Sequence, residues 1–443
     1  MSTTDMRNKS SADEPTEVGS VFISNYPPYS FWDESMVPEA TQALSCAPLP
    51  DATLGLYLHI PFCRLRCKFC YFKVYTDKDN TQVKRYLAAM AREVELYAAH
   101  ASVAGRPLKF VYFGGGTPSY ISSGDLRILA TRLKAALPWE GATEVTFECE
   151  PGTLTRSKLE TIRDIGVTRL SLGVESFDDG VLKENGRAHL SEEIERCMPW
   201  IRETGFQQLN IDLIAGMVGE TWSTWKKSVA RTLELDPDSV TIYQMELPYN
   251  TVYSQDVLAG RLGQPLADWA AKRAWHDYAF QELEAADYEI SSAYTVVKKG
   301  RSAGFIYRDA VWHGTDMVGA GVASFGHMSG VHLQNSPDWN DYLETLEAGN
   351  LPLSRAFRTT REQRLIRELI LQLKLGRLEP EYFQEKFQVD ILKQFGPTFR
   401  RLESRQLLQM DGGRLQLTRD ALLKVDLLLP EFYAPEHRNA RYT

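Results

Sequence analysis

The chain has 443 residues, of which 43% are hydrophobic, and a formal net charge of −8. This length allows one large core and a smaller second domain, and the acidic balance argues against a nucleic-acid-binding protein. No apolar run is long enough to span a bilayer, the N-terminus lacks a signal-peptide pattern, and the cysteines do not suggest a disulfide framework, so a cytoplasmic protein is expected.

The first fifty residues divide into two segments. Residues 1–20 are rich in Ser, Thr, Asp and Glu and have almost no large apolar side chains, which predicts a disordered tail. Residues 21–50 contain the run Tyr26-Pro-Pro-Tyr29-Ser-Phe31-Trp32, which is too apolar to remain in solvent. This N-terminal arm is expected to pack on the main body as a strap, and a role in covering an active site is the alternative.

From Leu54 onward, short apolar runs alternate with longer amphipathic stretches, which is typical of repeated βα units around a parallel sheet. Six such units predict an α/β protein with a partial (βα)6 barrel. The expected strands are Leu54–Ile60, Lys109–Gly114, Glu144–Cys149, Arg169–Val174, Gln208–Ile214 and Ser239–Met245. The expected helices lie near 80–97, 124–136, 155–164, 191–204 and 221–234, and another helix over 267–286 leads into one further strand over Tyr288–Val297.

The composition divides the rest of the chain into a barrel over residues 51–300, an extension over 301–355 that completes the site, and a domain over 356–443. In the last segment, a leucine-rich helix over 361–375 is followed by more helices, a Gly412-Gly413 turn and a short strand, Leu415–Thr418. This order predicts a small, mostly helical, winged-helix-like domain. Winged helices often bind DNA, but the acidic balance favours a packing or substrate-covering role.

In a βα barrel, chemistry takes place on the loops at the carboxyl ends of the strands. The unusual polar and glycine-rich features of this chain fall at or near these ends, which predicts one shared site. Along the six strands in order they are the Cys63–Cys70 segment, Gly114-Gly-Gly-Thr117-Pro118, Glu148-Cys-Glu150, Glu175, Asp212 and Glu246.

Three cysteines, Cys63, Cys67 and Cys70, lie within eight residues in the spacing C-x3-C-x2-C. Three thiolates this close together can bind one soft metal centre. They are one fewer than the four that usually close an iron–sulfur cube, so one iron would be free to bind something else. A closed zinc site needs four protein ligands, and no fourth Cys or His follows at a suitable spacing. The other cysteines are scattered and are expected to be ordinary residues: Cys46, Cys149 and Cys197.

This motif, directly after a first strand, resembles the signature of radical S-adenosylmethionine (SAM) enzymes. The sequence Tyr57-Leu-His-Ile-Pro-Phe-Cys63 is similar in particular to the branch that contains oxygen-independent coproporphyrinogen III oxidase and a related haem chaperone. The resemblance runs from about Val21 to the C-terminus. It implies a [4Fe–4S] cluster on the three cysteines and SAM on the open iron, whose cleavage yields a 5′-deoxyadenosyl radical that abstracts hydrogen from a substrate.

The resemblance also implies a set of SAM contacts. Gly115 and Gly116 let the backbone approach a ligand closely and expose N–H groups. Asp212 and Glu175 suit ribose hydroxyls, which donate hydrogen bonds to carboxylates, and Arg187 suits a carboxylate. The full set is Tyr57, Phe69, Gly115, Gly116, Thr117, Glu148, Glu175, Arg187, Asp212, Met245 and Phe325. Glu150 is equally suited to this site and to capping the next helix.

Basic residues and histidines are the remaining candidates. Positive side chains around the thiolates offset negative charge and tune the reduction potential, and the alternatives are attraction of an acidic electron donor or carboxylate substrate, or a solvated basic loop. These residues are Arg64, Arg66, Lys68 and Lys73. Three histidines near the glycine-rich segment 319–326 match no metal-ligand spacing, which favours ordinary hydrogen-bonded residues. They are His313, His327 and His332.

The chain departs from its relatives at several positions. Phe72 stands where the oxidases carry a further cysteine, and Asn185-Gly-Arg187-Ala-His189 looks more like the haem chaperone, whereas Ile23-Ser-Asn-Tyr26-Pro27 resembles the arm of the oxidase. The leading expectation is oxidative decarboxylation of a carboxylate-bearing tetrapyrrole, with a flavodoxin or ferredoxin as reducing partner and no nucleic acid. A class C radical SAM methyltransferase that uses two SAM molecules and a haem-binding chaperone are the alternatives.

Overall fold

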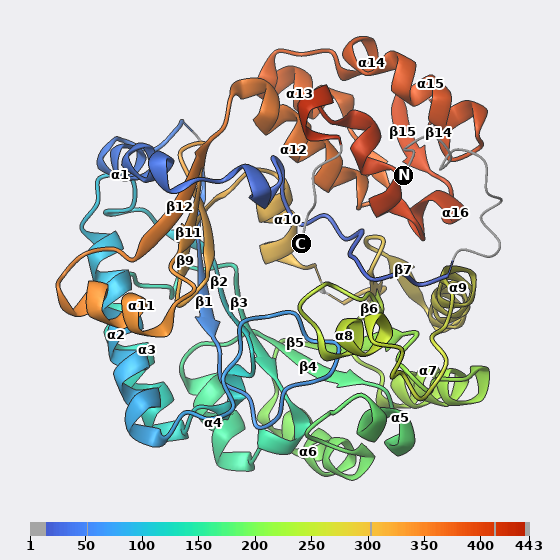
Figure 1. The fold of residues 1–443 in the computed structure, drawn as a ribbon, viewed down its shortest axis with the longest axis horizontal. Helices are drawn as coiled ribbons and strands as arrows, with labels where there is room; N and C mark the ends of the chain where they lie inside the picture. The colour runs from blue at the N-terminus through green and yellow to red at the C-terminus, as the bar shows by residue number, and fades with distance from the viewer. Residues whose placement is uncertain (1–14, 51, 302–303, 412, 439–443) are drawn as a thin grey trace.

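The computed structural model describes residues 15–50, 52–301, 304–411 and 413–438. Its centre is a twelve-stranded sheet with helices on its outer side, and a three-stranded sheet lies in the C-terminal region (Figure 1). The expected α/β class with a largely parallel sheet is confirmed. Most of the predicted disordered tail, residues 1–14, lies outside the described residues.

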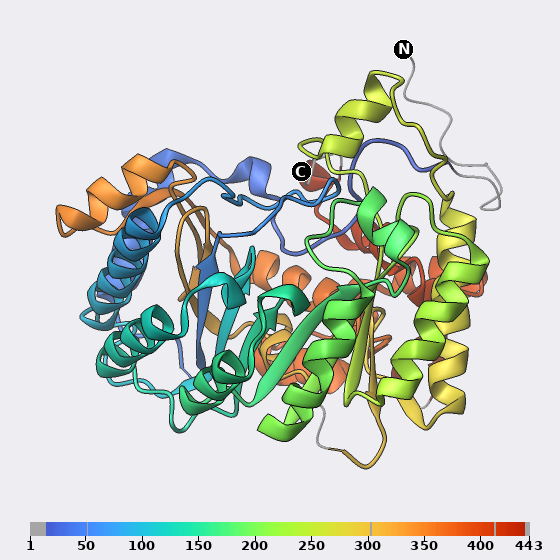
Figure 2. The same ribbon diagram turned by 90° about the horizontal axis from the view of Figure 1, so that it is seen from below.

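Six parallel strands form the wall of the partial barrel in the order β1-β2-β3-β4-β5-β6, as the sequence predicts. They are β1 (Leu54–Ile60), β2 (Leu108–Gly115), β3 (Glu144–Cys149), β4 (Arg169–Glu175), β5 (Gln208–Ala215) and β6 (Ser239–Gln244). The helices between them lie outside the sheet (Figure 2). They are α2 (Asn80–Ala98), α3 (Ser123–Ala136), α4 (Arg156–Asp164), α5 (Asp179–Glu184), α6 (Ser191–Thr204) and α7 (Trp222–Leu235).

The two faces of the barrel strands differ in polarity. In β4, Leu170 and Leu172 belong to the main hydrophobic core, because successive side chains of a strand point to opposite faces and these meet the helices. The residues between them face the barrel interior and are polar. Ser171 donates a hydrogen bond to Asp212 of β5 at 2.9 Å, and Ser239 of β6 donates one to Asn210 at 2.8 Å. We call this inner layer, made of Arg169, Ser171, Asn210, Asp212 and Ser239, the polar lumen.

The sheet continues beyond the barrel at both edges. On the β1 side, β9 (Asp316–Ala320) runs parallel to β1, and three antiparallel strands follow: β10 (Phe325–Met328), β11 (Val331–Asn335) and β12 (Leu353–Arg358). The sequence suggested only an extension here. On the β6 side, the single strand predicted over Tyr288–Val297 is wrong. A hairpin forms instead, from β7 (Tyr288–Ile290) and β8 (Thr295–Lys298), because the Ser292 side chain accepts backbone hydrogen bonds that turn the chain.

Helices also accompany these additions and build the C-terminal region. They are α8 (Val252–Leu258), α9 (Trp269–Ala285), α10 (Ile306–Trp312) and α11 (Trp339–Glu347). The C-terminal region comprises α12 (Arg361–Leu373), β13 (Arg377–Leu378), α13 (Pro380–Phe387), α14 (Ile391–Gln394), α15 (Gly396–Ser404), β14 (Leu408–Asp411), β15 (Arg414–Leu417) and α16 (Arg419–Leu422). In the predicted glycine turn, Gly412 lies outside the described residues, and the domain boundaries drawn from composition stay predictions. No helix in the described ranges has the length and apolar character that a bilayer crossing requires.

The N-terminal arm packs on the rest of the molecule, as its composition predicts. Val21 donates a backbone hydrogen bond to Glu246 after β6 at 3.1 Å, Ile23 donates one to Asp426 at 2.9 Å, and Asp33 pairs with Ala356 of β12. The prediction of a disordered tail is wrong for its last residues, since Gly19 pairs with Leu247. In Figure 1 the blue trace of the arm passes from the C-terminal elements to α1 (Val37–Ser45) on the other side of the sheet. The arm therefore connects the barrel, the sheet extension and the C-terminal region.

Candidate functional site

The three clustered cysteines lie on the loop of residues 61–75 that follows β1, which we call the cysteine loop. Its two ends are joined, because Tyr75 donates a backbone hydrogen bond to Pro61 at 2.7 Å and Cys63 donates one to Tyr75 at 3.1 Å. Cys63, Cys67 and Cys70 are all partly buried. The loop therefore presents its thiols from a closed, fixed turn at the end of the first strand.

The glycine segment after β2 lies against the cysteine loop. Gly116 and Thr117 donate backbone hydrogen bonds to Ile60 and Phe62, each at 2.8 Å. The Thr117 hydroxyl donates a hydrogen bond to Cys63 Sγ at 3.3 Å. A Cβ atom on Gly116 would lie 3.0 Å from the same sulfur and 2.9 Å from the backbone of Pro61. Glycine is required at this position because the backbone approaches the cysteine so closely.

On the other side of the cysteine loop, Arg187 connects Cys67 to β4. Its Nη1 donates a hydrogen bond to Cys67 Sγ at 3.3 Å, and its Nη2 donates one to the Gly173 carbonyl at 2.7 Å. The same Nη2 lies 3.5 Å from Glu175 Oε1. Asn185 holds this segment in place. Its side chain is fully buried, and its backbone carbonyl accepts a hydrogen bond from the backbone N–H of Lys68 at 3.1 Å.

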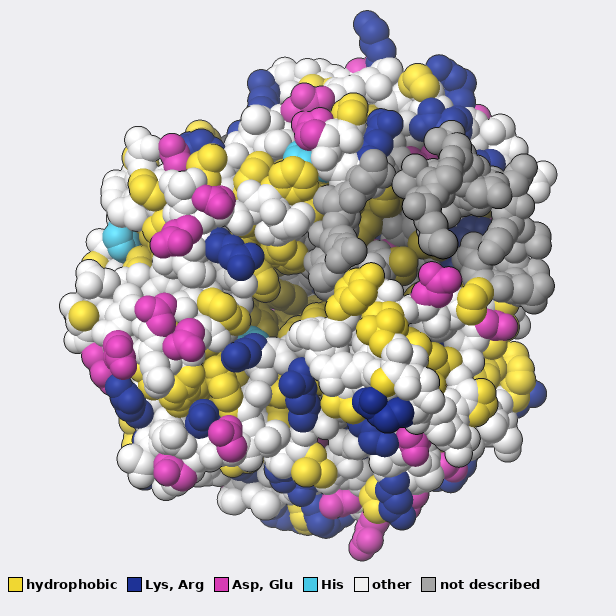
Figure 3. All heavy atoms as spheres, viewed as in Figure 1, with side chains coloured by type: hydrophobic (Ala, Val, Ile, Leu, Met, Phe, Trp, Pro, Cys, Tyr) yellow, Lys and Arg dark blue, Asp and Glu magenta, His cyan; other side chains and the backbone are white. Residues whose placement is uncertain are grey.

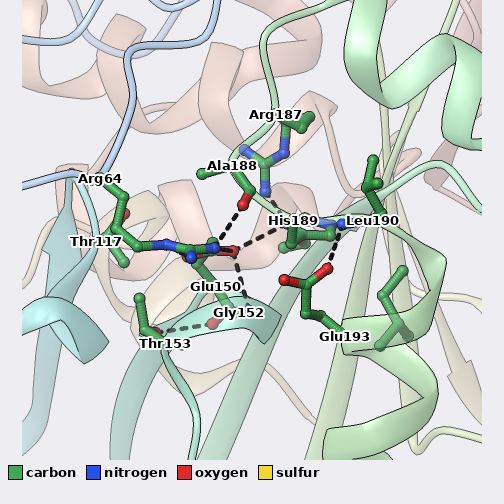
Figure 4. Close-up of polar contacts among 12 residues, drawn as sticks. Arg64, Thr117, Glu150, Gly152, Thr153, Arg187, Ala188, His189, Leu190 and Glu193 are labelled. Carbon is green, nitrogen blue, oxygen red and sulfur yellow. Dashed lines mark hydrogen bonds and ion pairs between the residues drawn. The ribbon is translucent and has the colours of Figure 1, made fainter.

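A second set of contacts joins Arg64 of the cysteine loop to Glu150 after β3 and to residues 188 and 189 (Figure 4). Arg64 donates two hydrogen bonds to Glu150, at 3.1 and 2.9 Å, and one to the Ala188 carbonyl at 2.6 Å. His189 Nδ1 lies 3.2 Å from Glu150 Oε1. Burial disfavours the ionised carboxylate, but hydrogen bonds from His189 and Arg64 lower the pKa of Glu150 to about 2. Glu150 also accepts the backbone N–H of Gly152, so it has the capping role that the sequence left open.

Glu148 and Glu175 lie at the carboxyl ends of β3 and β4, and Asp212 lies within β5 on the side that faces the barrel interior. We call these three carboxylates the acidic group. Burial is the main cause that raises the pKa of Glu148 and of Glu175 to about 7, and the charge of Asp212 contributes to both increases. Burial also raises the pKa of Asp212. Arg187 and Arg169 partly offset this charge, so the acidic group favours a ligand with positive charge or hydroxyl donors.

Local contacts aim each carboxylate of the acidic group. Glu148 accepts hydrogen bonds from the Tyr112 hydroxyl at 2.7 Å and from the Gly115 backbone at 3.1 Å. Asp212 accepts from Ser171 at 2.9 Å. Glu175 follows a register shift in the pairing of β4 with β5 and has a φ of 66°, which is costly for a residue other than glycine. The strained backbone turns its side chain towards Arg187.

The predicted aromatic and apolar contacts are spread around the mouth of the barrel. The Tyr57 ring stacks on Tyr112 with 5.8 Å between centroids. Phe69 packs against the small apolar cluster that contains Met245. Phe325 lies on β10, where its ring meets Tyr29 of the arm at 4.4 Å. The structure thus brings Tyr57 to the acidic group and Phe69 to Met245, whereas the arm covers Phe325.

The candidate histidines have ordinary hydrogen bonds, as the sequence predicts. His313 Nδ1 lies 2.6 Å from the Asp309 carbonyl. His327 and His332 are paired through their Nδ1 atoms at 2.9 Å, and His332 Nε2 lies 3.0 Å from the Tyr26 carbonyl. These partners account for the three rings without a metal.

Arg169 is a site residue that the sequence analysis missed. It is 1% exposed and extends across the polar lumen, where Nη2 donates a hydrogen bond to Ser239 at 3.2 Å and the guanidinium lies 4.2 Å from the Phe305 ring centroid. Its Nε and Nη1 have no partner among the described residues. One signal in the sequence could have identified Arg169. Strands of a parallel sheet are normally apolar on both faces, whereas these strands have a polar residue at every second position.

The thiols fit an iron–sulfur cluster better than a single ion. Among the described residues, no three His, Cys, Asp or Glu side chains converge on one ion position, whereas a cluster places its thiolates on separate irons. Burial raises the pKa of Cys63 to about 11 and of Cys70 to about 12, so their thiolates need a positive partner. Figure 3 shows a hollow at the centre of the face of the molecule that is also seen in Figure 1. Hydrophobic side chains lie inside the hollow, and Lys or Arg side chains lie on its rim.

Comparison with known proteins is consistent with this geometry. Residues 57–231 match the Radical SAM superfamily. The chain is 27% identical over 409 residues to the oxygen-independent coproporphyrinogen III oxidase of Pseudomonas aeruginosa, covering 88% of each protein. It is 27% identical over 372 residues to the heme chaperone HemW of Bacillus subtilis, covering 83% of this chain and 96% of the relative. It is 30% identical over 315 residues to HemW of Mycobacterium tuberculosis, covering 70% of this chain and 78% of the relative.

The fold is also found in a solved structure. The coproporphyrinogen III oxidase HemN of Escherichia coli, described as a radical SAM enzyme, superposes with a TM-score of 0.79. The match covers 93% of this chain and 96% of that protein at 23% sequence identity. The likeness therefore extends over the arm-bearing and C-terminal parts of the fold as well as the barrel.

Proposed function

Since this chain belongs to the radical SAM superfamily, we propose that it abstracts hydrogen from a carboxylate-bearing tetrapyrrole. Its group within the superfamily contains the oxygen-independent coproporphyrinogen III oxidases and HemW, and the chain uses a [4Fe–4S] cluster and SAM. The observation that carries the proposal is the meeting of three thiols and three buried carboxylates at one edge of the sheet. Thiols suit iron, and carboxylates suit the cationic, hydroxyl-bearing SAM molecule.

Cys63, Cys67 and Cys70 would hold the cluster. When bound, the cluster and SAM supply an electron and then a 5′-deoxyadenosyl radical, which takes a hydrogen atom from the substrate. The chain tunes this chemistry through hydrogen bonds, because Thr117 and Arg187 each donate to a thiol sulfur. Such bonds withdraw charge from thiolate ligands and raise the reduction potential of a cluster.

The acidic group would orient SAM beside the cysteines. Its carboxylates accept hydrogen bonds from hydroxyl groups and attract the sulfonium charge, while the Gly115–Gly116 backbone leaves room for a close approach. Arg187 lies between a thiol and Glu175, where it limits repulsion between the two negative groups. The other contacts proposed for SAM are Tyr57, Phe69, Thr117, Met245 and Phe325.

As the specific reaction we assign oxidative decarboxylation of propionate side chains. A C–H bond of the side chain and the C–C bond to the carboxylate break, carbon dioxide leaves, and a C=C bond forms. The side chain loses two electrons: one leaves with the hydrogen atom and the other passes to an electron acceptor. The exposed Arg64, Arg66 and Lys73 favour the approach of an acidic reductant such as a flavodoxin or ferredoxin.

The test is anaerobic reconstitution of the wild type and of a variant with all three loop cysteines changed to Ala. The wild type should bind iron and inorganic sulfide and produce 5′-deoxyadenosine from SAM, and with coproporphyrinogen III and an electron acceptor it should release carbon dioxide. The variant should do none of these. SAM cleavage by the variant would contradict the proposed cluster ligands.

Haem delivery is the second candidate, because HemW of Bacillus subtilis has the same 27% identity to this chain as the Pseudomonas aeruginosa oxidase and covers 83% of it, compared with 88%. A chaperone would bind haem stoichiometrically and transfer it to an apoprotein without turnover of coproporphyrinogen. A methyltransferase would form S-adenosylhomocysteine together with 5′-deoxyadenosine. Product analysis of the same reconstituted protein distinguishes the three activities.

A further inference from the structure

Arg367 of α12 is a buried cation that forms no ion pair with a carboxylate in the described part of the chain. Its residue is 4% exposed, and its one hydrogen bond within the described part of the chain runs from Nε to Asn25 Oδ1 at 2.6 Å. The neighbouring Glu368 is already paired with Lys386 at 2.9 Å. A buried charge without a counter-ion is costly, so an anion at this position would relieve a penalty that the protein alone leaves in place.

The position of Arg367 is at the mouth of the barrel. Its partner Asn25 follows Ser24, whose hydroxyl lies 3.0 Å from the Tyr29 hydroxyl. The Tyr29 ring in turn contacts Phe325, which the strand registers place level with Tyr57 of β1. The arm segment that holds Arg367 therefore also covers Phe325 at this edge of the sheet.

The arm also fixes which donors of Arg367 remain available. His332 Nε2 lies 3.0 Å from the Tyr26 carbonyl and must donate to it, which makes His332 Nδ1 an acceptor. His327 Nδ1 lies 2.9 Å from that atom and the Asn25 amide nitrogen lies 3.4 Å from it. The Asn25 amide oxygen is on the opposite side of the amide and accepts the hydrogen bond from Arg367 Nε at 2.6 Å. Nε is thus committed, and both Nη groups are left to donate. Two parallel Nη donors match the two oxygens of a carboxylate.

We propose that Arg367 binds a carboxylate group of the substrate at the mouth of the barrel, with Asn25 and Tyr29 of the arm orienting it. The inference rests on the proposed function and adds to it an anchor for one carboxylate of a tetrapyrrole. It also gives the arm a part in recognition, since Asn25 sets the direction of the guanidinium. Lys374, which is also buried, is not available for this role because Asp426 pairs with it at 2.8 Å.

Binding of a stable porphyrin tests the anchor without any radical chemistry. The reconstituted protein, without reductant, is titrated with coproporphyrin III and with its tetramethyl ester in the same detergent, and affinity is read from porphyrin absorbance. The wild type should prefer the tetra-acid. Arg367→Gln should weaken tetra-acid binding at least about tenfold, the loss expected for a charge-assisted pair, and leave ester binding unchanged.

The matched control is Arg361→Gln, which removes the same charge from an exposed position on the same helix and should not alter either affinity. If Arg367→Gln does not fold, Arg367→Lys keeps the charge and should lose part of the preference for the acid. Equal binding of acid and ester by the wild type, or an unchanged preference in the folded variant, would overturn the inference. SAM cleavage is assayed separately, so failure of the proposed reaction would be seen there and not in this titration.

Discussion

At the scale of single residues, Gly116 shows how little room the cysteine loop allows. The Cβ of Gly116→Ala would lie within 3.0 Å of both Cys63 Sγ and the Pro61 backbone. We expect the loop to shift and the reconstituted protein to retain less than about half of the wild-type iron and sulfide, because overpacking of this kind costs about 1–3 kcal/mol. Gly141→Ala, where nothing lies within 4 Å, is the control and should keep its full iron content.

The acidic group gives the free protein a pH-dependent stability. Folding raises the pKa of Glu148 and of Glu175 from 4.5 to about 7. Their contribution to stability is therefore complete below about pH 4.5 and is lost as the pH rises through about 7. In thermal melts without SAM, we expect the Tm to fall between about pH 4.5 and pH 7, and the double variant Glu148→Gln/Glu175→Gln to show a flatter profile.

SAM should reverse this trend. Ionised carboxylates attract a cationic ligand, so the affinity for SAM should increase over the same pH range in which the free protein loses stability. Isothermal titration of the anaerobic protein at several pH values measures this directly. An affinity that decreases as the pH rises, or a free protein whose Tm increases, would show that the three carboxylates do not meet SAM as proposed.

At the scale of elements, Glu93 joins α2 to the extended part of the sheet. Its buried carboxylate accepts hydrogen bonds from the Gly321 backbone at 2.9 Å, from Asn335 at 2.6 Å and from Tyr342 at 2.6 Å. In Glu93→Gln, the side-chain N–H₂ would replace one of the two acceptor oxygens and would face hydrogen-bond donors. We expect unfolding in urea to show that the free energy of unfolding falls by about 1–3 kcal/mol. Glu95→Gln, which removes a partly exposed ion pair on the same helix, should cost less than about 1 kcal/mol.

The elements that the sequence predicted are those with strong local patterns. The strands β1 to β6 and the helices between them were recognisable because each strand is a short apolar run and each helix has one apolar face. The strands β9 to β12 of the extension were not recognised, because Gly319, Gly321 and Gly326 interrupt the apolar pattern and the strands after β9 pair in antiparallel fashion, without helices between β9, β10 and β11.

The candidate site divides in the same way. The cysteines, the glycine turn and the strand-end carboxylates were found because each stands out within a few residues of sequence. Arg169 and Arg367 were not. Arg169 is marked by buried nitrogens without hydrogen-bond partners, and Arg367 by burial without an ion pair among the described residues. Both properties depend on segments far apart in the chain, and no local pattern records them.

At the scale of the whole molecule, Asp426 holds the arm and the C-terminal region together. It accepts the Ile23 backbone N–H at 2.9 Å, pairs with buried Lys374 at 2.8 Å and accepts the Tyr294 hydroxyl. Asp426→Asn leaves the buried Lys374 without a counter-ion. We therefore expect the free energy of unfolding to fall by about 3–5 kcal/mol and proteolysis within the arm to become faster. Asp420→Asn, at an exposed i, i+4 pair, should change stability by about 0.5 kcal/mol or less.

The polar lumen has a consequence for how such proteins can diverge. The hydrocarbon that stabilises the barrel wall lies on the outward side of the strands, against the helices. Exchanges of hydrogen-bonded partners together among the inward residues therefore alter what the interior can hold without removing hydrocarbon from the core, while the outward row tolerates few changes. A scaffold built in this way can acquire new ligands by replacing a handful of interior side chains and keeping its architecture.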